Sequence, residues 1–164
     1  MKRHGLRSAL MVCVLGTVLL RAGEPNLAPN PSFEEGEAGR VSGWSFWNWA
    51  RKGQGAGTHV GTWDSQVAHT GTRSLRIQGT EAGKVGVWDN KHGGALIAVE
   101  AGKTYELSFW ARTHTLPGEG VLDRVMLGFY DTAREPMVKA GRALNTQLSG
   151  ETDWMRLTVR ADAP

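Results

Sequence analysis

The sequence is poor in residues that carry covalent, redox or metal chemistry. Its 164 residues include one cysteine, Cys13, which lies in the N-terminal apolar segment, so the rest of the chain has no thiol for a disulfide or a thiolate site. The histidines after this segment show none of the close pair spacings typical of zinc sites. A Gly-x-Ser-x-Gly nucleophile motif and a P-loop motif are also missing. These absences argue against a zinc enzyme, a serine hydrolase of that type and a nucleotide hydrolase.

Long apolar runs are scarce too. The longest, Ser8–Leu20, is shorter than the roughly 20 residues that span a bilayer. Lys2, Arg3 and Arg7 precede it, and small Ala22 follows it. This order predicts a signal peptide over residues 1–22, hence a secreted, extracellular protein with no membrane attachment after cleavage. An uncleaved membrane anchor is the alternative.

The sequence has no excess of positive charge outside that leader. The leader holds four of the 19 basic residues and none of the 16 acidic ones, so 15 basic and 16 acidic residues remain, a net charge near −1. A nucleic-acid partner needs a basic face for the phosphates and is therefore not expected.

Helical periodicity is absent from residue 24 onward, and short alternating stretches take its place. In Tyr105–Arg112, the residues Tyr105, Leu107, Phe109 and Ala111 share one face. Similar alternation occurs in 74–78, 85–88, 125–130 and 154–160, where Leu75, Ile77, Val85 and Val87 are expected to point inward. Turns rich in glycine, among the 22 glycines of the chain, separate these stretches. The pattern predicts an all-β sandwich or jelly roll over residues 23–164.

Several motifs in a fixed order resemble a known family. They are Asn26–Glu34, Gly43-Trp44, Ala68–Leu75, Val99–Arg112 and Thr152-Asp153-Trp154. Together they are similar to the CenC-like carbohydrate-binding modules of families four and nine. The resemblance implies a jelly-roll β-sandwich of two antiparallel sheets, of the galactose-binding-like type. It also implies one more strand with an acidic pair after the last strand seen here, so the sequence is expected to be part of a longer protein and to lack that strand.

Candidate sugar contacts are the aromatic and guanidinium groups expected on the outward faces. Flat rings stack on the C–H faces of sugars, and polar groups orient the hydroxyls. Trp110 is the expected platform and Arg112 the hydroxyl donor, while Trp88 and Tyr130 offer further platforms. Each could instead be covered by a loop or lie at a sheet edge. Trp47 and Trp49 fit either a rim platform or an apolar plug under a loop, and Trp44 and Trp154 are expected to be structural.

A structural Ca²⁺ is a further implication of the resemblance. Carried over to this sequence, the site would use the Glu34 carboxylate and backbone carbonyls around Gly71 and Thr72. The alternative is that Glu34 is a solvated acid in a loop.

The sequence thus predicts a secreted, non-catalytic module that binds a polysaccharide and tethers a glycoside hydrolase to it, as a monomer or covalently linked to further domains. A structural spacer of a cell-surface protein is the first alternative. A jelly-roll glycan hydrolase or lyase, with Glu106 as the candidate acid, is the second.

Overall fold

The computed structural model describes residues 10–17, 25–49, 59–79, 85–92, 96–115, 121–137 and 142–164. All regular elements among them are strands, and none of these residues belongs to a helix long and apolar enough to cross a membrane. The strands are β1 (Leu10–Thr17), β2 (Gly36–Glu37), β3 (Arg40–Val41), β4 (Ser45–Trp49), β5 (Val60–Asp64), β6 (Ser74–Gln78), β7 (Val85–Asp89), β8 (Thr104–Thr115), β9 (Val121–Leu127), β10 (Arg142–Ser149) and β11 (Met155–Asp162).

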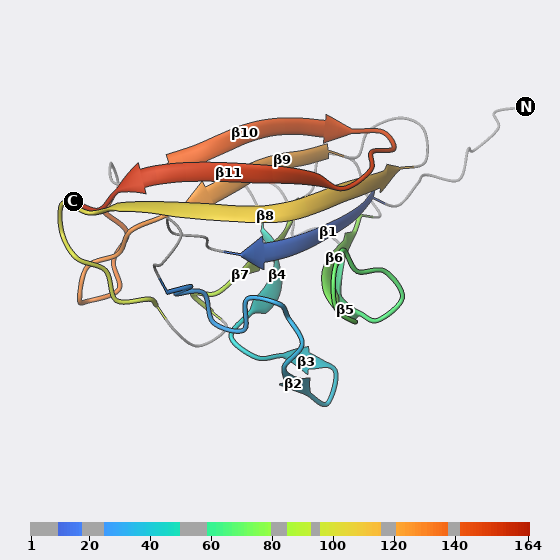
Figure 1. Ribbon diagram of the computed structural model, residues 1–164, viewed down its shortest axis with the longest axis horizontal. Helices are drawn as coiled ribbons and strands as arrows, with labels where there is room; N and C mark the ends of the chain where they lie inside the picture. The colour runs from blue at the N-terminus through green and yellow to red at the C-terminus, as the bar shows by residue number, and fades with distance from the viewer. Residues whose placement is uncertain are drawn as a thin grey trace, which may run out of the picture.

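The larger layer is a five-stranded antiparallel sheet in the order β11-β8-β1-β6-β5. Three strand pairs accompany it, namely β9 with β10, β4 with β7, and the short hairpin of β2 and β3. Figure 1 shows β8 running the length of the molecule, with β11 on one side of it and β1 on the other. The expected all-β sandwich of antiparallel sheets is confirmed.

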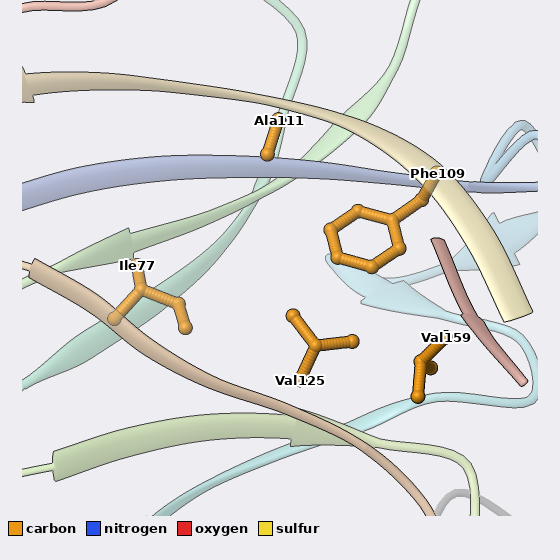
Figure 2. Close-up of a cluster of buried hydrophobic side chains, with 5 residues drawn as sticks. All are labelled: Ile77, Phe109, Ala111, Val125 and Val159. Carbon is orange, nitrogen blue, oxygen red and sulfur yellow. The ribbon is translucent and has the colours of Figure 1, made fainter. Parts of the chain in front are cut away.

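The core lies between the five-stranded sheet and the pairs β9–β10 and β4–β7. Five buried residues form its centre, drawn in Figure 2: Ile77, Phe109, Ala111, Val125 and Val159. Phe46 and Trp88 from the β4–β7 pair pack against this cluster, as does Leu148 of β10. Both pairs therefore belong to a second layer that covers the inner face of the sheet.

Strand alternation was predicted correctly for β6 and β8. Leu75, Ile77, Phe109 and Ala111 are all buried, as expected. On β7 the prediction was wrong, because Trp88 faces the core instead of the valines. A Cβ atom on Gly86, which shares the Trp88 face, would meet Phe46 and Ile77 at 2.9 and 3.0 Å. Alternation defines two faces, but both faces of β7 are apolar, so the pattern alone could not say which one is buried.

The opening segment before β2 covers a second, smaller apolar cluster of Phe33, Val41 and Leu75. Phe33 is fully buried although its φ is 61°, a region that non-glycine residues rarely adopt. The indole of Trp44 donates to the carbonyl of Pro29 at 3.0 Å and its ring meets Phe33 edge-on. The structural role expected for Trp44 is confirmed.

Strand β1 comes from the segment predicted to be a signal peptide. Residues 10–17 lie between β6 and β8, pairing at four positions with β6 and at eight with β8. Removal of residues 1–22 stays a prediction. It is coupled to the fold, because a chain cleaved after Ala22 would not contain this central strand.

Candidate functional site

Two aromatic clusters lie on the two layers of the sandwich. The Trp47 cluster comprises Trp47, Asp89, Lys91, His92 and Tyr130 and belongs to the second layer. The His69 cluster comprises His69, Trp110, Arg112 and Trp154 and belongs to the five-stranded sheet. Four of the predicted sugar-binding residues are thus divided between two places, Trp47 and Tyr130 in one cluster and Trp110 and Arg112 in the other.

Trp47 occupies the outer face of the β4–β7 pair. It lies between Phe46 and Asn48 on β4, and Phe46 points into the core, so alternation turns Trp47 the other way. Its indole nitrogen donates to Oδ2 of Asp89 at 2.6 Å. The backbone of Trp49 pairs with Val85, and its side chain lies outside the described residues.

Asp89 also holds His92 in the turn that follows β7. Its Oδ1 accepts the backbone N–H of His92 at 2.9 Å, and Nδ1 of the imidazole lies 2.8 Å from Oδ2. The rings of Trp47 and His92 are 5.4 Å apart and inclined by 63°. One carboxylate therefore fixes an aromatic ring and an exposed imidazole beside each other.

Tyr130 completes this cluster from the segment after β9. Its backbone forms an isolated bridge with Pro136, and Lys91 places its ammonium group 4.4 Å from the centre of the ring. The small residue Gly128 lies close by, where an added Cβ would come within 3.7 Å of the tyrosine ring. Tyr130 as a whole is half-buried.

The His69 cluster is packed against itself. The ring of Trp110 stacks on His69 at 4.3 Å with only 11° between the planes, and the edge of Trp154 meets the same imidazole at 5.3 Å. Arg112 lies 5.8 Å from the centre of the Trp154 ring. Trp110 also packs against the cluster around Phe33. One face of the expected platform is therefore covered by a histidine from the 65–73 loop.

Trp88, the remaining predicted platform, lies half-buried between the two apolar clusters. Its indole nitrogen donates to the carbonyl of Arg76 at 3.1 Å and its ring contacts Phe46. These contacts account for the side chain as part of the core, and a sugar contact by Trp88 stays a prediction.

The three residues predicted to hold calcium do meet. Thr72 donates to the Glu34 carboxylate through its hydroxyl at 2.5 Å and its backbone N–H at 2.9 Å, and the N–H of Arg73 adds a bond of 3.1 Å. The Thr72 hydroxyl, together with these backbone bonds and the charge of Arg73, holds the pKa of Glu34 below its usual value. Gly71, at φ 69°, has no room for a Cβ beside Glu34.

Hydrogen bonds from protein groups to Glu34 hold the 71–73 turn. Calcium takes six to eight oxygen ligands, whereas the groups facing Glu34 here are hydrogen-bond donors. Among the described residues no three or more acidic, histidine or cysteine side chains form a group that could hold a metal. The described residues therefore do not fit a calcium ion by themselves, and a structural Ca²⁺ stays a prediction.

Glu106, the candidate catalytic acid, is engaged in cross-strand ion pairs. Its carboxylate accepts from Nε of Arg160 at 2.5 Å and lies 3.8 Å from Arg156, both on the neighbouring β11. Both ion pairs join β8 to β11, so Glu106 has a structural role within the five-stranded sheet.

Comparison with known proteins settles the family. A family model described as a carbohydrate binding domain matches residues 25–157. The chain belongs to this family. No curated protein and no solved structure matches the chain. The predicted family resemblance is confirmed, and membership indicates carbohydrate binding by a domain of a generally non-catalytic type.

Sequence reasoning missed three members of the Trp47 cluster. Asp89, Lys91 and His92 were not predicted as site residues, because nothing in a linear pattern shows that β4 returns beside β7. The sequence did contain one indication of this contact. In an Asp–x–x–His sequence at the start of a turn, the aspartate carboxylate can accept the backbone N–H of the histidine.

Proposed function

We propose that this carbohydrate-binding domain holds a polysaccharide on the outer face of the β4–β7 pair, with Trp47 and Tyr130 as the stacking platforms. The observation that carries the proposal is the fixed Trp47 ring beside the exposed imidazole of His92. Sugar sites combine an apolar face with a few convergent polar groups, and this cluster supplies both.

The strength of such a site is modest. Stacking one sugar on one ring removes on the order of 50–80 Å² of apolar surface, equivalent to about 1–2 kcal/mol at about 25 cal/mol per Å². Two platforms together supply about 2–4 kcal/mol, so stacking alone corresponds to a dissociation constant of about millimolar or weaker. That range suits a module that tethers a glycoside hydrolase to a polymer with many copies of its ligand. Secretion belongs to the same proposal.

The His69 cluster is the second candidate surface. Arg112 is only half-buried and its guanidinium is in contact with Trp154, so a sugar could reach both groups from solvent. This surface requires His69 to leave the face of Trp110 before Trp110 itself can stack on a sugar.

Affinity electrophoresis against soluble polysaccharides tests the two surfaces separately. We expect Trp47→Ala and Tyr130→Ala to lose most of the retention shown by the parent chain, and Trp110→Ala to keep it once correct folding is verified by circular dichroism. The reverse result would transfer the site to the His69 cluster. Failure of the folded parent chain on every glycan would favour a structural spacer.

A further inference from the structure

Both oxygens of the Asp89 carboxylate accept hydrogen bonds within the Trp47 cluster. Oδ2 accepts from the Trp47 indole at 2.6 Å and lies 2.8 Å from Nδ1 of His92, while Oδ1 accepts the His92 backbone N–H at 2.9 Å. An ionised carboxylate can only accept, so Nδ1 must carry the proton in this contact. In the neutral imidazole the other nitrogen, Nε2, is then a lone-pair acceptor.

That second nitrogen faces away from the carboxylate that orients the ring. The His92 side chain is 55% exposed, against 23% for Asp89. Among the hydrogen bonds of the described residues none engages Nε2 of His92. The group is therefore both oriented and available to a ligand.

The two rings held by Asp89 form a corner. Their planes are inclined by 63° and their centres are 5.4 Å apart, with both ring edges turned to the same carboxylate oxygen. A pyranose stacked on Trp47 places its C–H face on the indole and directs its equatorial hydroxyls sideways, toward the other wall of the corner.

We infer that His92 selects the sugar that stacks on Trp47, by accepting a hydrogen bond at Nε2 from a free hydroxyl of that sugar. This rests on the proposed function and adds to it the chemistry of the ligand: a glycan whose hydroxyl at this position is unsubstituted. A methyl ether cannot donate, and a site that binds a hydroxyl rejects the analogue lacking it because its own polar group is left unpaired.

The Asp89–His92 pair does not have the form of a catalytic dyad. In a hydrolase the second ring nitrogen meets the hydroxyl or thiol that it activates. No such partner of Nε2 is present among the described residues. Recognition uses the same orientation of the ring and requires no further protein group.

The test compares four chains: the parent, His92→Phe, His92→Gln and His114→Phe. Phe keeps a ring at position 92 and removes the acceptor, whereas Gln restores an acceptor. His114 is the matched control because its Nδ1 also pairs with a carboxylate, that of Glu151 at 3.3 Å, and it is 49% exposed on β8. The probes are soluble mixed-linkage β-glucan, xylan, mannan and laminarin, each native and partially O-methylated.

We expect the parent chain to prefer at least one native glycan over its methylated form. His92→Phe should lose about tenfold in affinity for the native glycan and bind the two forms alike. His92→Gln should recover part of the preference, and His114→Phe should match the parent. Equal preference in the parent and in His92→Phe overturns the inference.

A fifth chain, Trp47→Ala, separates the proposed sugar site from the inferred role of His92. If it abolishes binding to both forms while His92→Phe behaves as the parent, the platform stands and only the role of His92 falls. If Trp47→Ala binds as the parent, or the folded parent binds no probe, the proposed site falls and the inference falls with it.

Discussion

A chain that begins at Gly23 tests whether β1 belongs to the folded domain. The deletion removes Leu10–Thr17 from between β6 and β8, the centre of the five-stranded sheet. We expect the shortened chain to lose most of its cooperative stability.

The magnitude follows from the pairing. β1 pairs at four positions with β6 and at eight with β8, which in antiparallel ladders corresponds to on the order of ten backbone hydrogen bonds. At about 0.5–1.5 kcal/mol net for each bond, their loss amounts to about 5–15 kcal/mol. This equals the whole free energy of unfolding of a typical domain. The buried side chains Leu75 and Ala111, on the two flanking strands, would also lose their neighbouring strand.

Urea unfolding of the two chains, followed by tryptophan fluorescence and circular dichroism, makes the comparison. The expected result is a cooperative transition for residues 1–164 and a weak or missing one for residues 23–164. Equal midpoints and equal slopes would refute the reasoning, because β6 and β8 would then not depend on β1. N-terminal sequencing of the exported protein measures independently whether residues 1–22 are removed.

Three further predictions concern the turn at Glu34 and the packing of β5. The pKa of Glu34 is lowered in the folded state, so its contribution to stability is complete above the ordinary carboxyl pKa and is lost as pH falls through the lowered value. Glu34→Gln should therefore lower the melting temperature at pH 7 and flatten the acid side of a plot of melting temperature against pH; an unchanged plot would contradict this account. Chelation with EGTA should leave the melting temperature unchanged, because protein donors already bind Glu34, and a fall on chelation would instead support the predicted calcium. Gly61→Ala should destabilise by about 1–3 kcal/mol in urea unfolding, since a Cβ would come within 2.1 Å of the Phe46 ring, and equal stability would show that this ring can move aside.

The fold was predictable where one face of a strand is apolar and the other polar. On β8 the polar residues Glu106 and Arg112 alternate with Leu107 and Ala111, so the buried face was unambiguous. On β7 valines alternate with Gly86 and Trp88, and tertiary packing decided between two apolar faces. A glycine suits the inner face because Phe46 and Ile77 already fill the space over it.

The candidate site was predictable only in part, for a related reason. Aromatic residues could be named from the sequence, but their neighbours come from other strands and loops. The ring of Trp110 is covered by His69, which lies about 40 positions earlier in the chain. Trp47 contacts Asp89 and His92, which lie about as far after it. A sequence pattern says least about side chains whose contacts come from residues far away in the chain.

The two layers differ in how their outward polar groups are used, and this difference favours the second layer for ligand binding. On the five-stranded sheet, Glu106 is paired with Arg160 and Arg156. A ligand there must compete with the ion pairs of Glu106. On the β4–β7 face, the hydrogen bonds of Asp89 orient the side chains of Trp47 and His92. The entropic cost of ordering those two rings thus falls on folding and not on binding. A shallow site with two or three contacts can retain a sugar only under this condition.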